Sequence, residues 1–399
     1  MSCQSFALLY LRSKYMQGTI SKWLSSACIA ASLASWCGSV AAADVVFGQI
    51  ASLSNPASTA NAKGLMVGAK ACFDSINARG GIHGNKLKLD TRDDGLNGPK
   101  MVEMTAEMIN DPSIVGLLSF LNTAGLTALT KQNAFGTGKI ALIAPLQGDK
   151  AIVEAENVFP LRSGYGAELE TLLKEAKTWG KDTISIVNMN IAFGPILAEV
   201  AQKRAAELGL KVVSRSVVNF SPDTQPATVR EAVEAINKAQ PKAIFVVAAG
   251  KPAEEFIKAV RSTPGGLAQI YGLSVLLHDE LVKTAGADKA RGIVLSQATP
   301  YPFTPSRAVI NEYQAAMKTH APKEPLSFSS LEGYLGAKIA AEAVRRAGAK
   351  PDRERVLAAL KNLGEYDLGG LYVNYTPQAR RGWGGVELTI INADGNLRK

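Results

Sequence analysis

From residue 45 onward, short apolar runs rich in β-branched side chains alternate with longer amphipathic stretches. The runs with the length and composition of strands are 45–50, 86–91, 114–120, 139–144, 183–188, 211–218, 242–249, 270–275 and 292–297. Stretches with helical periodicity lie between them, at 61–79, 98–110, 123–135, 166–179, 195–208, 226–239 and 252–263. Because apolar strands separated by helices are typical of parallel sheets covered on both faces, the pattern predicts an α/β fold.

The alternation runs through two series, which are separated by the stretch NVFPLRSG at 157–164. After residue 300 it breaks, and helical patterns at 305–319 and 329–348 follow without strands of their own. Such helices must pack on a sheet formed earlier, so the chain is expected to cross three times between two Rossmann-like lobes. The predicted architecture is two lobes with parallel sheets joined by a three-strand hinge.

The predicted crossings divide the chain into discontinuous lobes. The N-terminal lobe is expected to contain 44–161 plus 299–366, and the C-terminal lobe 162–298 plus 367–399. A chain of 399 residues is long enough for two such domains.

Residues 1–43 have the composition of a secretory signal peptide. A basic segment precedes an apolar run of small residues at 23–40, and AAAD follows at 41–44. This order predicts cleavage after Ala43 and a periplasmic mature chain, whether translation starts at Met1 or at Met16.

Charge and cysteine content exclude several classes of protein. The formal net charge is +9, and the basic residues are scattered without interleaved aromatic residues, so we expect no nucleic-acid partner. Of the four cysteines, Cys3, Cys28 and Cys37 lie in the signal segment, and Cys72 is expected to be a buried structural thiol rather than a nucleophile. Lipidation at Cys37 is disfavoured because bulky Trp36 precedes it.

Small polar residues follow several predicted strands. They are Asn122, Thr123, Gln147, Gly148, Gly250 and Ser274, with Phe193 beside them in the stretch NMNIAFGPIL. In open α/β sheets, ligands bind beyond the carboxyl ends of the strands, where N–H groups of helix N-termini converge. Thr123 could cap a helix or hold a carboxylate, and each junction could be an ordinary loop. Their shared placement favours a ligand cleft.

Catalytic and metal-binding signals are weak. His83, His278 and His320 are far apart in the sequence, and the chain has neither a G-x-S-x-G elbow nor a phosphate-binding glycine loop. Asp93 and Asp94 follow a predicted strand, where ordering of a loop is favoured over a metal site. We therefore expect no catalytic residue, no metal and no cofactor.

Several long blocks resemble one protein family. They include GLMVGAKACFDSINARGGIHGNKLKLDTRDDGLNGPKMVEMTAEMIND, KPAEEFIKAVR, YPFTPSRAVINEYQAAMK, SSLEGYLGAKIAAEAVRRAG and YDLGGLYVNYTP. Together they span the mature chain and resemble the periplasmic branched-chain amino-acid-binding proteins, the Leu/Ile/Val-binding-protein-like receptors of ABC importers. The resemblance implies the type I periplasmic binding protein fold, ligand capture between the lobes, hinge closure and docking to a membrane permease. We expect the mature chain to be a monomer.

The resemblance assigns roles to the candidate residues. The family's α-carboxylate loop corresponds to Asn122 and Thr123, and the loop after the fourth strand corresponds to Leu146, Gln147 and Gly148. An aromatic contact from the second lobe corresponds to Phe193. Gly250 stands where relatives often have an aromatic residue, and VLLH follows Ser274 where amino-acid binders place an acidic residue. The ligand is therefore expected to be an amino acid, an amide or an aromatic acid.

Two alternatives remain open at the level of sequence. A doubly wound scaffold can also carry a periplasmic enzyme, and the same fold can serve as a ligand-sensing subunit. The sequence identifies neither the ligand nor the partner permease.

Overall fold

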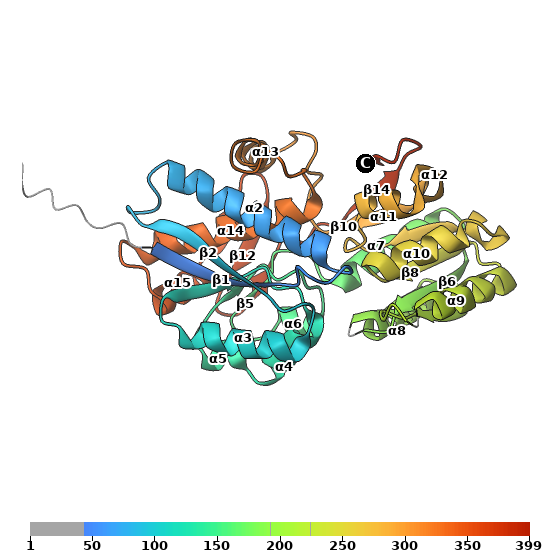
Figure 1. Ribbon diagram of the computed structural model, residues 1–399, viewed down its shortest axis with the longest axis horizontal. Helices are drawn as coiled ribbons and strands as arrows, with labels where there is room; N and C mark the ends of the chain where they lie inside the picture. Colours follow the sequence, from blue (N-terminus) through green and yellow to red (C-terminus); the bar gives the residue numbers. More distant parts are fainter. Residues whose placement is uncertain (1–43, 192, 224) are drawn as a thin grey trace, which may run out of the picture. The chain divides into compact units, whose positions relative to one another are not determined.

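The computed structural model of this chain describes residues 44–399 except residues 192 and 224. The predicted signal peptide, with Cys3, Cys28, Cys37 and the cleavage after Ala43, lies outside the described residues. The described chain forms two large sheets with helices along them and one small antiparallel sheet (Figure 1).

The first sheet has five parallel strands in the order β2-β1-β3-β4-β5. They are β1 (Asp44–Ala51), β2 (Lys86–Asp93), β3 (Ile114–Leu118), β4 (Leu142–Ile143) and β5 (Val158–Phe159). The helices between them are α2 (Thr59–Ala78), α3 (Gly98–Asn110), α4 (Thr123–Lys131), α5 (Ala134–Thr137) and α6 (Lys150–Val153). Two separate cores form on this sheet, one including Phe47 and Phe73, the other including Met101 and Leu126.

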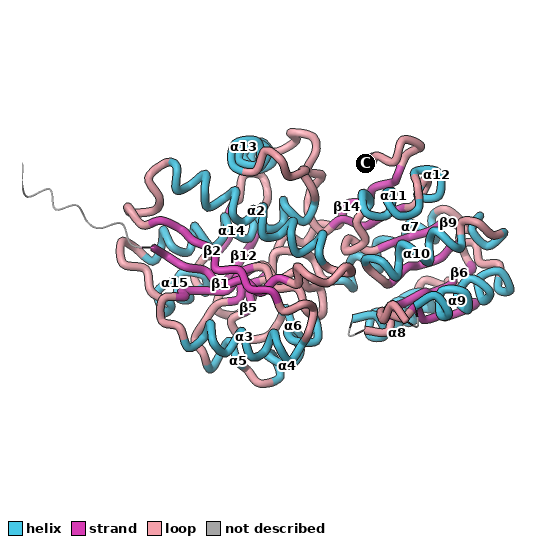
Figure 2. The backbone as a smooth tube through the Cα atoms, in the orientation of Figure 1, coloured by secondary structure: helices cyan, strands magenta, loops and turns pink. Residues whose placement is uncertain are grey.

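The second sheet has seven strands in the order β15-β14-β10-β9-β8-β6-β7. Its parallel strands are β6 (Thr183–Met189), β7 (Lys211–Val218), β8 (Ala243–Val247), β9 (Gln269–Gly272) and β10 (Val294–Gln297). β14 (Glu387–Ile391) and β15 (Leu397–Arg398) complete it as antiparallel strands. Figure 2 distinguishes the strands, in magenta, from the helices, in cyan.

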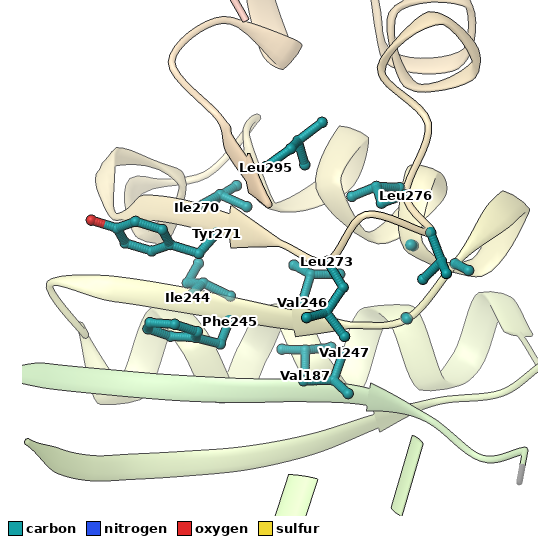
Figure 3. Close-up of a cluster of buried hydrophobic side chains, with 14 of the residues drawn as sticks. Val187, Ile244, Phe245, Val246, Val247, Ile270, Tyr271, Leu273, Leu276 and Leu295 are labelled. Atoms are coloured by element: carbon teal, nitrogen blue, oxygen red, sulfur yellow. The ribbon is translucent and has the colours of Figure 1, made fainter. Parts of the chain in front are cut away.

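Helices of the second sheet are α7 (Tyr165–Thr178), α8 (Phe193–Glu207), α9 (Gln225–Ala239), α10 (Gly250–Val260), η1 (Pro264–Leu267), α11 (His278–Ala285) and α12 (Ala287–Ala290). Apolar side chains of β8 and β9 fill the core beneath them (Figure 3). The rings of Phe245 and Tyr271 stack there with their centroids 5.0 Å apart. These two sheets and their helices confirm the predicted α/β class.

Three late helices pack on the first sheet. They are α13 (Ala308–His320), α14 (Phe328–Ala347) and α15 (Arg353–Lys361). Tyr313, Leu335 and Val356 share a core with Phe47 of β1. We call the five-stranded sheet with its helices and α13–α15 the first lobe, and the seven-stranded sheet with its helices the second lobe.

The contact between α2 and α14 depends on glycine. A Cβ atom on Gly68 would lie 1.8 Å from the carbonyl oxygen of Ser330, and one on Gly333 would lie 2.0 Å from that of Leu65. Real Cβ atoms do not approach so closely, so each helix uses a glycine to admit the backbone of the other. Cys72 is buried on α2, and burial raises the pKa of its thiol to about 12.

The last crossing comes later in the structure than the sequence pattern placed it. β11 (Gly364–Asp367), β12 (Tyr372–Tyr375) and β13 (Arg380–Arg381) form the small sheet, and Leu368 and Val373 pack in the first lobe's core. The hydroxyl of Tyr375 donates to the carbonyl of Pro160 over 2.7 Å. Segment 367–375 therefore lies with the first lobe and not with the second, to which the sequence pattern assigns it. The alternation of YVNY predicts which face of the strand is buried, but it does not predict which of the two cores that face enters.

Candidate functional site

A cavity of about 330 Å³ lies where strand ends of both lobes meet. The first lobe lines it with Ala57, Ser58, Asn61, Leu96, Leu121, Asn122, Thr123, Ala124, Leu146 and Gln147. The second lobe lines it with Tyr165, Met189, Ile191, Phe193, Phe220, Ala249 and Val275. This is the position that open α/β sheets offer to ligands.

Asn122 shapes the start of α4. Its Oδ1 accepts from the N–H of Gly125 at 3.2 Å and caps the helix, while its Nδ2 donates to Oδ2 of Asp94 at 2.8 Å. Asn122 is therefore the N-cap of α4. The Thr123 hydroxyl, which the sequence suggested as a possible cap, does not cap the helix. Helix geometry also leaves the first-turn N–H groups of Thr123 and Ala124 without intrahelical acceptors.

Gln147 fixes the direction of the Thr123 hydroxyl. Its Nε2 donates to the carbonyl of Leu121 at 3.0 Å and to Oγ1 of Thr123 at 2.7 Å. A carbonyl can only accept, so Leu121 determines which end of the amide is the NH₂ group. Because Oγ1 of Thr123 accepts from that amide, its own proton is available to an acceptor elsewhere. Thr123 is thus a hydrogen-bond donor on the cavity wall.

Asp93 and Asp94 order the loops behind this wall. Oδ1 of Asp94 accepts from Oγ of Ser52 at 2.6 Å, and Oδ1 of Asp93 accepts from the N–H of Leu53 at 2.9 Å. Asp94 is buried, and neither aspartate lines the cavity. Among the described residues, no group of three His, Cys, Asp or Glu side chains could hold a metal ion.

The remaining wall is mostly apolar, with Ser58 and Asn61 as its further polar residues. The ring of Tyr165 lies 6.0 Å from that of Phe193, between centroids, and the two come from the starts of α7 and α8. Burial raises the pKa of the Tyr165 hydroxyl, so it stays protonated at neutral pH. Leu121, Leu146 and Val275 add aliphatic surface. The cavity therefore pairs a small polar pole at Thr123 with a larger hydrophobic part.

Five of the eight residues selected from the sequence line this cavity: Asn122, Thr123, Leu146, Gln147 and Phe193. Gly148 lies behind it, where a Cβ atom would be 2.4 Å from the backbone nitrogen of Tyr165. Gly250 lines a neighbouring cavity of about 370 Å³ and has a φ of +58°. Its Cβ atom would meet the backbone of Ala57.

Ser274 belongs to a buried polar network instead of the cavity wall. Its hydroxyl accepts from Nη1 of Arg162 at 3.1 Å and donates to Oε1 of Glu168 at 3.1 Å. Arg162 also makes a two-pronged pair with Glu332 of α14, at 2.9 and 2.7 Å. Ser296 donates to Glu168 at 2.6 Å. Arg162 stands at the first crossing between the lobes, so this network joins them.

Sequence reasoning missed several lining residues. Ser58 and Asn61 lie at the start of α2, and Met189 ends β6. The rule that selected Thr123 applies equally to these junctions, so they could have been found. Phe220 follows β7, and nothing in its sequence context distinguishes it from other loop aromatics.

Five helices of the described chain begin at the cavity. Ser58 is the N-cap of α2 and Ala249 is the N-cap of α10, while α4, α7 and α8 begin at Thr123, Tyr165 and Phe193. Helix N-termini carry partial positive charge, which favours anions. The described residues that line the cavity include no Asp, Glu, Lys, Arg or His. The electrostatic character of the site is therefore set by backbone N–H groups.

A larger cavity of about 700 Å³ lies along α2, α13 and α14, within the first lobe. Its wall contains two ion pairs, Lys338 with Glu312 and Arg345 with Glu342, together with Arg79. Because only the first lobe lines it, a ligand there would make no contact with the second lobe. No described helix is both long and apolar enough to cross a membrane.

Comparison with known proteins agrees with this architecture. The Leu/Ile/Val-binding protein BraC3 of Rhizobium johnstonii is 23% identical over 329 residues, which cover 81% of this chain and 85% of that protein. A substrate-binding periplasmic protein from Ralstonia solanacearum has a TM-score of 0.82 and 30% identity, and the match covers 89% of this chain and 99% of that one.

A branched-chain amino-acid ABC transporter protein from Thermus thermophilus, solved with bound valine, has a TM-score of 0.77. It is 19% identical, with 90% of this chain and 95% of that chain covered, and so shows a shared fold. The family described as periplasmic binding protein matches residues 44–396, nearly all of the described chain. The chain therefore belongs to the periplasmic binding protein family.

Proposed function

We propose that the mature chain captures a small carboxylate-bearing or otherwise polar ligand in the 330 Å³ cavity and delivers it to an ABC importer. The candidate classes are amino acids, amides and aromatic acids. Both lobes line the cavity, so a bound ligand would contact both and favour a closed arrangement of the hinge.

The observation that carries the proposal is the directed hydroxyl of Thr123. It lies in a largely apolar cavity, where Gln147 occupies its acceptor side at 2.7 Å. The proton of this hydroxyl has no acceptor among the described residues. A polar group placed in this way in a largely apolar cavity can fix the orientation of a ligand. Capture needs no further chemistry, and we propose that the protein releases its ligand unchanged rather than acting as an enzyme.

The similar proteins support the proposed role in transport. They are solute-binding proteins, and the Thermus thermophilus protein was solved with valine. We propose a membrane permease as the partner, a monomeric receptor, and secretion to the periplasm with cleavage after Ala43.

The test is a thermal-shift screen followed by calorimetry. The mature protein is first unfolded and refolded to strip any ligand, then screened against amino acids, amides, aliphatic and aromatic acids, sugars and polyamines. A ligand present at 100 times its Kd should stabilise the fold by about 2.7 kcal/mol. Stabilisation by at least one solute, recovered unaltered, is the expected result. No binding by any class, or chemical conversion of a bound solute, would overturn the proposal.

A further inference from the structure

We infer that the ligand is a monocarboxylate with an apolar body and no ammonium group. This inference rests on the proposed function and names the class of ligand for the same cavity. It follows from the hydrogen-bonding capacity of the polar pole, from the charge of the surrounding helix ends and from the side chains that line the rest of the wall.

The polar pole offers donors. The oxygen of the Thr123 hydroxyl accepts from Gln147 at 2.7 Å, which leaves its proton and one lone pair for a ligand. The first-turn N–H groups of Thr123 and Ala124 point in the same sense along α4. The Oδ1 of Asn122 is engaged by the N–H of Gly125, and Oε1 of Gln147 is a buried acceptor without a partner among the described residues, so donors outnumber acceptors at this pole. A group with two acceptor oxygens, such as a carboxylate, matches this arrangement.

The helix ends add positive potential without a compensating acid. Neither Ser58, the N-cap of α2, nor Ala249, the N-cap of α10, makes a side-chain cap bond, and the hydroxyl of Ser58 donates to the carbonyl of Ser52 at 2.9 Å. Several N-termini therefore act together on the cavity. Such a field stabilises one negative charge and opposes a positive one.

An ammonium group would have no charged partner here. Among the described residues, the cavity wall carries no carboxylate. The acidic side chains at the nearby start of α10 are engaged, Glu254 with the hydroxyl of Thr284 at 2.7 Å and Glu255 with Lys251 at 3.0 Å. Burying a charge without a partner is costly, so a zwitterionic amino acid should bind more weakly than its deaminated counterpart.

The test uses matched ligands that differ only in the group at issue. Calorimetry on the refolded mature protein would compare 4-methylpentanoate with leucine, and 3-phenylpropanoate with phenylalanine. The neutral 4-methylpentanamide separates the contribution of the carboxylate from that of the apolar body. We expect at least one of the two acids to bind, with an affinity at least tenfold above that of its amino acid. We expect 4-methylpentanoate to bind more tightly than the amide.

The outcomes separate this inference from the proposed function. Equal or tighter binding of leucine or phenylalanine would overturn the inference and leave solute capture intact, as would preference for the amide. Binding of a sugar or polyamine alone would do the same. Absence of binding in the whole screen would contradict both.

Discussion

At the scale of single residues, the candidate site depends on a series of hydrogen bonds that determines which side-chain atoms donate and which accept. Leu121 orients the amide of Gln147, and that amide turns the hydroxyl of Thr123 into a donor. Asn122 takes the capping role. The sequence alone could select Asn122 and Thr123 but could not divide these roles between them, because either side chain can cap a helix.

Thr123→Val should lower the affinity for a carboxylate ligand by about 1–3 kcal/mol, since a ligand oxygen would lose its hydrogen bond in a buried site. Calorimetry with the tightest acid of the panel measures this change. The matched control is Thr127→Val, one turn further along α4, where the hydroxyl bonds only to the carbonyl of Thr123 at 2.8 Å. Equal affinities for the two variants would remove Thr123 from the site.

At the scale of helices and strands, two contacts join segments that are far apart in the sequence. One is the network of Arg162, Glu332 and Glu168 at the first crossing, and the other is the glycine contact between α2 and α14. Neither touches the proposed ligand. Each can therefore be tested through stability without removing a ligand contact.

Glu332→Gln should destabilise the protein strongly. Removing one partner of a buried ion pair costs about 3–5 kcal/mol, because the remaining charge loses its compensation. In the variant, Glu168 still compensates part of the charge of Arg162, because its Oε1 lies 3.7 Å from Nη1 of Arg162. We therefore expect the free energy of unfolding to fall by about 3 kcal/mol, at the lower end of this range. Urea denaturation measures it.

The control for that variant is Asp182→Asn, which breaks an exposed pair with Lys242 at 2.9 Å and should change little. Similar unfolding midpoints for Glu332→Gln and Asp182→Asn would show that the buried network does not hold the crossing.

Gly68→Ala should also destabilise the fold, because the added methyl would lie on the carbonyl of Ser330 and force α2 and α14 apart. Gly166→Ala, in the first turn of α7, has open space around it and is the matched control. Thermal unfolding of both variants should show a clear loss for the first and none for the second. A neutral Gly68→Ala would mean that the two helices can separate without cost.

Nine of the ten parallel strands that the structure describes could be predicted, because the period and length of an apolar run specify a strand locally. β5 was missed, since it is only two residues long and lies in the stretch 157–164 that separates the two series. The strand-end rule also selected Asn122, Thr123, Gln147 and Phe193 of the cavity wall, and the family resemblance added Leu146. Segment 367–375 could not be assigned, since its partner sheet depends on tertiary packing. Ser274 illustrates the same limit. A small polar residue after a strand suits a ligand site, but here the buried charges of Arg162 and Glu168 occupy its hydroxyl.

At the scale of the whole molecule, the family, the two lobes and the cavity between their strand ends form one account of capture by a hinged receptor. Two cavities with about twice its volume are competing locations: the one along α2, α13 and α14, and one of about 640 Å³ that includes Pro56 and Pro226 in its wall. Volume alone does not select a site. The directed donor at Thr123 and the lining from both lobes favour the smaller cavity.

A crystal structure of the refolded mature protein with the tightest ligand of the screen tests this account most directly. We predict the ligand in the smaller cavity, with an acceptor oxygen within hydrogen-bonding distance of Oγ1 of Thr123 and its apolar body against Tyr165 and Phe193. Ligand bound instead along α2, α13 and α14, with the smaller cavity filled by solvent, would contradict it.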